Sequence, residues 1–393
     1  MSLNEKVSAE RIHIAFFGLR NAGKSSVVNA VTGQSLSVVS DVKGTTTDPV
    51  KKAMELLPLG PVVIIDTAGI DDEGALGELR VEKTKKILNK TDIAILVIDA
   101  VKGMQKEDIA LTEDFKKRNI PFIIAFNKVD LLSEKSALND NEIYVSAKEN
   151  FNIDELKNLI GKLIKTQENT EKTLLGDIVK ENDLIVLVTP IDSSAPKGRL
   201  ILPQQQTIRE LLDIGATVVV TKDTELKATL EKFKSPPKLV ITDSQAFKKV
   251  SAIVPETIEL TSFSILFARY KGELWGAVEG ANKLDELQDG DLVLISEGCT
   301  HHRQCGDIGT EKLPNWIKKY TNKNIGFDFT SGSDFSEDLS KYKLIIHCGA
   351  CMLTEREMKT RISLAEEQQI PISNYGIIIA KINGILERAV KML

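Results

Sequence analysis

The segment Gly18–Ser25 has the residue types and spacing of a phosphate-binding loop, G-x-x-x-x-G-K-S. It follows the apolar run Ile12–Phe17 and precedes a helical pattern, which is the context that such a loop requires. Glycines let backbone N–H groups approach a phosphate chain, and the positive end of the helix favours the anion. Lys24 would contact the β- and γ-phosphates, and the Ser25 hydroxyl would bind Mg²⁺. On this motif alone, an ordinary glycine-rich turn before a helix remains the alternative.

A second polar segment, Asp66–Gly69, follows the apolar run Val62–Ile65. Asp66 can hold Mg²⁺ through a water molecule, and the N–H of Gly69 can sense the γ-phosphate. Upstream, Gly44–Asp48 is the candidate first switch segment, in which we choose Thr46 as the Mg²⁺ ligand and keep its two threonine neighbours as alternatives. The predicted catalytic residues are Lys24, Thr46, Asp66 and Gly69.

Two further loops indicate which base is bound. Asn127–Asp130 follows the run Phe122–Phe126, and Ser146–Lys148 follows Ile143–Val145. The Asp130 carboxylate can accept hydrogen bonds from N1–H and the 2-amino group of guanine, a pattern that adenine lacks. Because all these loops leave the carboxyl ends of strands, we expect them to converge on GTP or GDP. The predicted nucleotide-binding residues are Asn21, Ala22, Gly23, Lys24, Ser25, Ser26, Asn127, Lys128, Asp130, Ser146, Ala147 and Lys148.

The hydrolytic machinery departs from the Ras pattern at two positions. Ile70 stands where Ras-like proteins carry the glutamine that orients the attacking water, so another group must position it. Asn21, with the threonine-rich Gly44–Asp48, resembles potassium-activated GTPases, in which this asparagine helps to bind K⁺ beside the phosphates. The ion would supply the charge otherwise given by an arginine finger. A loop-capping role for the Asn21 amide is the alternative.

The C-terminal third concentrates the thiols. It holds all four cysteines, and the pair Cys348 and Cys351 has C-x-x-C spacing directly after the run Leu344–Ile346. Cys299 follows another apolar run, so in a parallel sheet both groups would emerge at one edge. Thr354 begins a capping-box pattern, which places a helix N-terminus near Cys351 and favours a thiolate there.

The cysteine motif permits three kinds of site. Three thiolates would leave one iron of a 4Fe–4S cluster open, whereas C-x-x-C with histidine also suits structural zinc. Free buried cysteines are the third interpretation. Cys305 is either a fourth ligand or a small buried residue.

Together these motifs resemble the HydF family, the GTPase maturation factors of FeFe-hydrogenase. The pattern C-x-H-x₄₅-H-C-x-x-C, the segment Thr189–Pro203 and the sequence Asp307-Ile-Gly carry the resemblance over nearly the whole chain. The first 165 residues or so resemble the translation-factor-like GTPases of the Era and MnmE branch.

The resemblance implies a scaffold and carrier role. The middle domain would form a homodimer. Cys299, Cys348 and Cys351 would ligate a 4Fe–4S cluster, with His301 or His347 nearby or on the fourth iron. The cargo would be a transient di-iron subcluster, which radical-SAM hydrogenase maturases load and apo FeFe-hydrogenase receives. GTP hydrolysis would gate these exchanges of partner.

The amino-acid composition limits the possible fold classes and cellular compartments of the protein. The 393 residues are 42% apolar and 27% charged with a net charge of −5, which is typical of a soluble multidomain protein. We expect a cytoplasmic protein with no nucleic-acid or membrane partner, because we find no basic stripe, signal peptide or spanning apolar run. An RNA- or ribosome-associated GTPase with a structural zinc site is the rival interpretation.

Short valine-, isoleucine- and leucine-rich runs alternate with helical patterns along the whole chain, which predicts α/β domains with mainly parallel sheets. A helix over Ile153–Ile164 would close the first domain before the polar stretch Lys165–Lys172. We therefore expect a P-loop GTPase domain followed by two smaller α/β domains. The predicted bounds are 1–168 for GTP binding, 169–263 for dimerisation and 264–393 for the iron–sulfur cluster.

Overall fold

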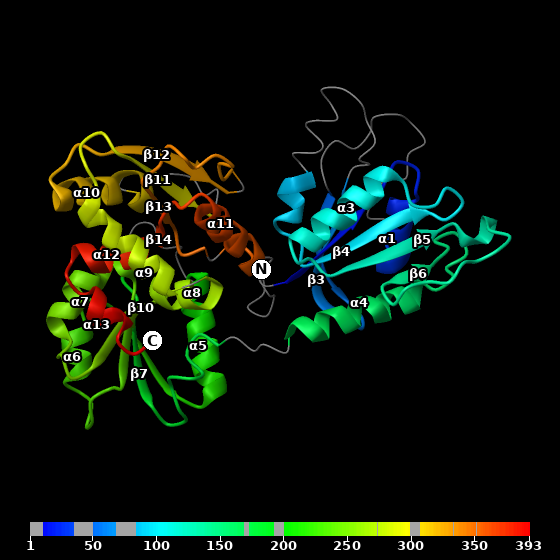
Figure 1. The fold of residues 1–393 in the computed structure, drawn as a ribbon. Coiled ribbons are helices and arrows are strands. Elements are labelled where there is room, and N and C mark those ends of the chain that lie inside the picture. The colour runs from blue at the N-terminus through cyan, green and yellow to red at the C-terminus, as the bar shows by residue number, and fades with distance from the viewer. Residues whose placement is uncertain are drawn as a thin grey trace. The chain divides into compact units, whose positions relative to one another are not determined.

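The computed structural model describes residues 11–34, 50–67, 84–168, 173–191, 200–272, 274–298, 307–332, 334–350 and 352–393. Contacts divide the chain into two compact units, residues 1–171 and 172–393, which Figure 1 shows as ribbons. In the described ranges, the helices all lack the length or the apolar character needed to cross a lipid bilayer.

The N-terminal unit is built on a six-stranded sheet of order β2-β3-β1-β4-β5-β6. All neighbours are parallel except β2, which runs antiparallel to β3. Its strands are β1 (Ile12–Phe17), β2 (Val50–Leu56), β3 (Gly60–Asp66), β4 (Ile93–Asp99), β5 (Phe122–Asn127) and β6 (Glu142–Tyr144). Its helices are α1 (Lys24–Thr32), α3 (Lys106–Lys117), the short η2 (Val129–Leu131) and α4 (Ile153–Glu168).

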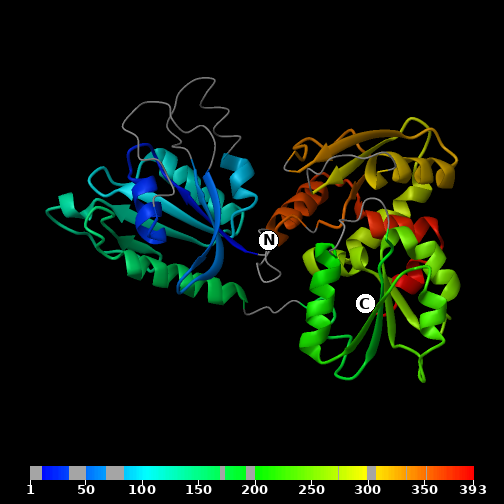
Figure 2. The same cartoon turned by 180° about the vertical axis from the view of Figure 1, so that it is seen from behind.

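Both faces of this sheet are covered. Alternate residues of β1 enter different apolar clusters: Phe16 packs with residues of α1 and α4, whereas Phe17 packs with Phe115 of α3. Accordingly, α3 lies on the face turned to the viewer in Figure 1 and α1 on the face seen in Figure 2. Burial on two faces explains why the central strands are continuous apolar runs.

The C-terminal unit begins with a parallel four-stranded sheet of order β10-β9-β7-β8. Its strands are β7 (Leu184–Val188), β8 (Thr217–Thr221), β9 (Leu239–Thr242) and β10 (Glu259–Ser262). The helices in this part are α5 (Leu202–Ile214), α6 (Leu226–Leu230), η3 (Ser244–Ala246), α7 (Phe247–Ile253) and α8 (Phe263–Lys271).

A second parallel four-stranded sheet follows, of order β12-β11-β13-β14. Its strands are β11 (Leu292–Glu297), β12 (Gly326–Ser331), β13 (Leu344–His347) and β14 (Ile372–Asn374). The remaining helices are α9 (Leu274–Asn282), η4 (Lys283–Glu286), η5 (Ile308–Lys312), α10 (Leu313–Thr321), α11 (Glu355–Glu367), α12 (Tyr375–Ile382) and α13 (Leu386–Val390).

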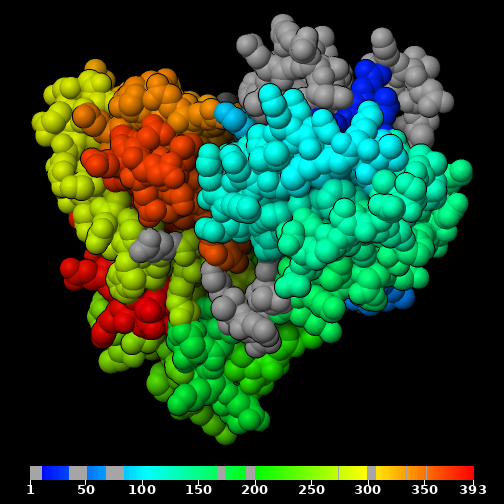
Figure 3. All heavy atoms as spheres, turned by 45° about the vertical axis from the view of Figure 1, so that its right-hand side comes forward, coloured from blue at the N-terminus to red at the C-terminus, as the bar shows by residue number. Residues whose placement is uncertain are grey.

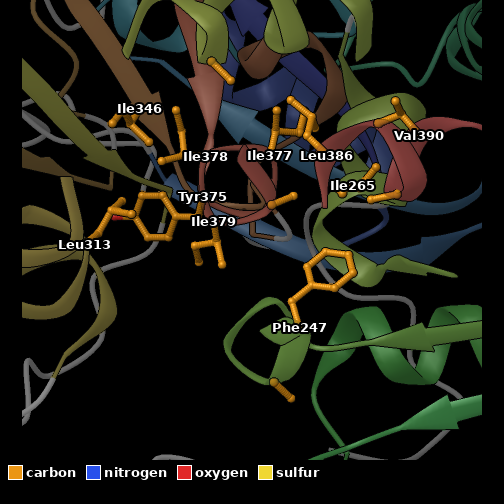
Figure 4. Packing of buried hydrophobic residues seen from close by; sticks show 14 of the residues in the cluster. Phe247, Ile265, Leu313, Ile346, Tyr375, Ile377, Ile378, Ile379, Leu386 and Val390 are labelled. Carbon is orange, nitrogen blue, oxygen red and sulfur yellow. The ribbon is translucent and has the colours of Figure 1, made fainter. Parts of the chain in front are cut away.

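One apolar cluster joins the two C-terminal sheets. It contains Val186 and Val240 from the first sheet and Ile295 and Ile346 from the second. Residues 375–380 of α12 are all buried in it, and Figure 4 shows the side chains of this helix at the centre of the packing. The two sheets therefore share a core inside one compact unit, and the predicted bound at residue 263 stays a prediction.

The strands that sequence patterns missed are β2, β10 and β14, and all three lie at sheet edges. Their sequences mix polar with apolar residues, as in Glu259–Ser262, so they show no continuous apolar run. The α/β class with mainly parallel sheets is confirmed. Helix α4 continues to Glu168, beyond its predicted end at Ile164.

Candidate functional site

The phosphate-loop segment joins β1 to α1 through two glycines in the left-handed region of φ. Gly23 (φ 85°) is the N-cap of α1, and Gly18 has φ 148°. A Cβ at Gly23 would collide with the side-chain amide of Asn127, and one at Gly18 with the carbonyl oxygen of Val97. Both glycines are thus required by close packing as well as by conformation.

Lys24, Ser25 and Asp66 converge at the end of β3. Lys24 and Asp66 are buried; the Ser25 hydroxyl donates to Asp66 Oδ2 at 2.8 Å, and Lys24 Nζ lies 3.6 Å from Asp66 Oδ1. Among the described residues, none donates a hydrogen bond to the buried Oδ1. A hydroxyl and a carboxylate with a free oxygen lone pair are ligands that Mg²⁺ prefers, so the residues fit this ion.

Asn127 connects the phosphate loop to the base-binding loops. It is buried, its Nδ2 donates to Ala22 O at 3.0 Å, and its Oδ1 accepts from the N–H of Ala147 at 3.1 Å. The Ser146 hydroxyl donates to Asp130 Oδ1 at 2.6 Å, which orients the carboxylate assigned to guanine. Hydrogen bonds between motif residues therefore assemble this site.

Asp99, the last residue of β4, is a member of the site that the motif search missed. Lys128 Nζ donates to Asp99 Oδ2 at 2.7 Å and to the Asn21 carbonyl at 2.6 Å. Burial by itself would raise the pKa of Asp99, but the hydrogen bonds from Lys128 and the Val101 N–H hold that pKa below its ordinary value. A polar residue closing an apolar strand at this sheet edge was the available signal.

The remaining predicted nucleotide residues divide by whether the structure describes them. Ser26 is half-buried in α1, whereas Asn21 (φ 62°) and Lys148 are exposed. Thr46 and Gly69 lie outside the described residues, so their catalytic roles stay predictions.

The cysteine site lies at the carboxyl ends of β11 and β13, which are neighbouring parallel strands. The N–H of Gly298 donates to Cys348 Sγ at 3.0 Å. Cys299 is the next residue in the sequence after Gly298. Cys299, His301, Cys305 and Cys351 are outside the described residues, and within the described ranges no three metal-binding side chains gather around one point.

His347 is fully buried, and both its ring nitrogens have partners. Nε2 lies 2.8 Å from Arg361 Nη1, and Nδ1 lies 2.9 Å from Cys348 O. A guanidinium can only donate, so Nε2 accepts and Nδ1–H donates to the Cys348 carbonyl. The imidazole thus fixes the Cys348 carbonyl group. For His347 to act as the predicted iron ligand, Arg361 would have to move away from Nε2.

Arg361 ties this network to α11, the orange-red segment at the surface of the C-terminal unit in Figure 3. Its buried guanidinium also donates to Ser296 Oγ at 3.2 Å and pairs with the buried Glu357 carboxylate at 3.1 Å. Burial lowers the pKa of Arg361, and Glu357 opposes that shift. Thr354 caps α11 through the Glu357 N–H, as predicted.

A cavity of about 250 Å³ opens beside Cys348, between α8, α9, α11 and β14. Gly349 and Ala350 line it, and the buried Lys271 lies at its wall. This room exceeds what one metal ion needs, so the site has space for a larger group. Neither Lys271 nor Arg361 belongs to the cysteine motif, and no local pattern marked either residue.

Three family models match successive parts of the chain. Residues 276–392 match the hydrogen maturase F tetramerization domain and residues 174–272 the hydrogen maturase F dimerization domain. The chain belongs to the hydrogen maturase F family. Residues 13–128 match a 50S ribosome-binding GTPase model, so the first unit of this hydrogen maturase F chain is a GTPase domain. The predicted family resemblance is confirmed.

Several individual relatives are GTPases that match about half of this chain. The tRNA modification GTPase MnmE of Acetivibrio thermocellus is 32% identical over 48% of this chain and 43% of its own length. GTPase Der of Kosmotoga olearia is 34% identical over 48% of this chain and 46% of its own. The chain thus spans less than half the length of these relatives. Era of Aquifex aeolicus is 17% identical in structural alignment, covering 82% of this chain and 94% of that one, with a TM-score of 0.35.

Proposed function

We propose that this chain is a GTP-hydrolysing scaffold that assembles and delivers the di-iron precursor of the FeFe-hydrogenase active site. Its C-terminal unit would hold a 4Fe–4S cluster through Cys299, Cys348 and Cys351. The observation that carries this proposal is the bond from the Gly298 N–H to Cys348 Sγ, because it brings the residue next to Cys299 against the C-x-x-C turn. Membership of the hydrogen maturase F family supports the same role.

In the GTPase domain, Lys24 would bind the β- and γ-phosphates and Asp130 would select guanine. Ser25 and Asp66 would hold Mg²⁺, which supplies charge neutralisation when bound. Asn21 would contribute to a K⁺ site, Thr46 would be a ligand of Mg²⁺ from the first switch segment, and the N–H of Gly69 would sense the γ-phosphate. Replacing K⁺ by Na⁺ should slow hydrolysis in wild type and have a smaller effect in Asn21→Ala; equal wild-type rates in the two salts would contradict the role of Asn21.

Its dimerization and tetramerization domains support formation of an oligomer. We propose a homodimer as the basic assembly, working in the cytoplasm. Radical-SAM hydrogenase maturases would load the scaffold, apo FeFe-hydrogenase would accept the di-iron cargo, and the nucleotide state would gate these exchanges.

The match of residues 13–128 to a ribosome-binding GTPase model favours a second candidate. An RNA- or ribosome-associated GTPase would use the same nucleotide motifs, with structural zinc at the cysteines. RNA that co-purifies with the protein and stimulates its GTPase rate would support this candidate against the scaffold.

Anaerobic metal and sulfide analysis tests the proposal. Wild type should contain about four iron and four sulfide ions per protein chain and absorb broadly in the visible range. Cys348→Ala should lose both, whereas Lys24→Ala, a matched variant in the other unit, should keep them. Colourless wild type with one tightly bound zinc would instead support the second candidate.

A further inference from the structure

Lys271, the last residue of α8, is 3% exposed and contacts the turn that carries the C-x-x-C pair. Its Nζ donates to Leu353 O at 2.9 Å and to Ala350 O at 3.3 Å. These carbonyls belong to residues on either side of Cys351 in the chain. A single buried ammonium therefore fixes the backbone of the turn between its second cysteine and the start of α11.

The turn needs such an anchor. Ala350 has φ 54°, a left-handed conformation that is unfavourable for a residue with a Cβ atom. On the strand side, the His347 imidazole already holds the Cys348 carbonyl. The segment after Cys348 turns away from β13, and there the Lys271 bonds replace the sheet as its fixed support.

We infer that Lys271 is a positioning residue for the cluster-binding turn, and this rests on the proposed function. It holds the backbone carbonyls of Ala350 and Leu353, described residues on either side of Cys351 in the sequence. Its positive charge, buried beside the site, also favours the reduced, more negative state of a bound cluster. Because α8 lies in the matched dimerization domain and the turn in the matched tetramerization domain, this contact also links the two.

Hydrogen exchange on the cluster-free protein tests the anchoring. Lys271→Met should speed exchange at least about tenfold at the Leu353 N–H, which donates to Ala350 O within the turn. Lys238→Met is the matched control, since Lys238 Nζ likewise donates to a backbone carbonyl, of Ile178 at 2.7 Å, away from the cysteines. Unchanged exchange in Lys271→Met would overturn the inference.

Reconstituted protein tests the effect on the cluster. Lys271→Met should lose iron to a chelator about 10–100-fold faster, the usual cost of removing an outer-shell contact, and its reduction potential should fall. Lys271→Arg should restore the potential. Lys271→Gln should keep the slow hydrogen exchange, because its amide still donates a hydrogen bond, but it should not keep the reduction potential, because it carries no charge. If Lys271→Met folds poorly, Lys271→Gln replaces it in the measurement of the potential.

These measurements separate two failures. Wild type that binds no cluster overturns the proposed function, and the exchange experiment then decides whether Lys271 anchors the turn. Wild type that binds a cluster, with the same potential and the same iron loss in Lys271→Met, overturns the inference alone.

Discussion

The nucleotide site and the cysteine site are both built at the carboxyl ends of parallel strands, but they are held together differently. In the GTPase domain the motif residues bond to one another, as Asn127 does to Ala22 and Ser146 does to Asp130. At the cysteine turn, two buried cations from helices outside the motif fix the neighbouring groups. Lys271 binds the backbone of the turn, and Arg361 binds His347.

This difference predicts which property, ligand binding or folding stability, a substitution at each site should damage. Removing one motif residue of the nucleotide site should damage ligand binding while the loops keep their other mutual bonds. Removing a supporting cation at the cysteine turn should damage the fold of the C-terminal unit, since the cation also satisfies buried groups such as Glu357 and Ser296.

The largest effect is expected for Arg361→Met. The change removes the buried cation that pairs with Glu357, and breaking a buried ion pair costs about 3–5 kcal/mol. Denaturant unfolding measures the loss. The double variant Arg361→Met with Glu357→Met should recover much of it, because no charge is then stranded. A loss below about 1 kcal/mol in the single variant would contradict the difference between the two sites.

Next comes Lys24→Ala. Hydrogen bonds to charged groups contribute about 1.5–3 kcal/mol each, so losing the phosphate contacts should weaken GTP binding roughly 100-fold. Fluorescent-nucleotide titration measures this affinity. The unfolding free energy should change far less than in Arg361→Met, and an equal loss in both variants would remove the distinction.

A smaller, more specific effect is expected for Asp130→Asn. The amide keeps one oxygen acceptor but adds a donor that faces guanine N–H groups, so selectivity for GTP over ATP should fall about tenfold or more. Competition binding with both nucleotides measures the ratio. Unchanged selectivity would show that Asp130 does not contact the base.

The smallest effect concerns Asp183, the residue directly before β7. The hydrogen bond from Lys238 and that from the Lys180 N–H hold the pKa of Asp183 below its ordinary value. A depressed pKa in the folded state means that the pair stabilises the fold above about pH 4 and that this contribution is lost as pH falls through the folded pKa. Asp183→Asn should lower stability at neutral pH by less than about 1 kcal/mol and flatten the acid limb of the unfolding curve.

Sequence reasoning succeeded where one physical constraint acts along a short segment. Ile93–Asp99 is wholly buried between two helical layers, so its apolar run marked it as a central strand. The phosphate loop was recognisable because its glycines, lysine and serine form one short contiguous motif between a strand and a helix. The polar edge strands, of which β10 is one, offered no such run.

The supporting residues could not be found that way. Lys271 ends an amphipathic helix, where a lysine is usually solvated, and only the tertiary fold shows that its ammonium is buried against the Ala350 and Leu353 carbonyls. Arg361 likewise forms an ordinary i, i+4 pair with Glu357 in sequence, and its bond to His347 depends on the packing of α11.

Helix α12 has a consequence for how the C-terminal unit can be divided. Its apolar side chains are packed between two sheets, and the chain reaches it only after the second sheet is complete. A truncated fragment ending after α8 would leave Val186 and Val240 facing water, and such surfaces drive aggregation. The part that matches the dimerization domain and the part that matches the tetramerization domain should therefore be expressed and purified together.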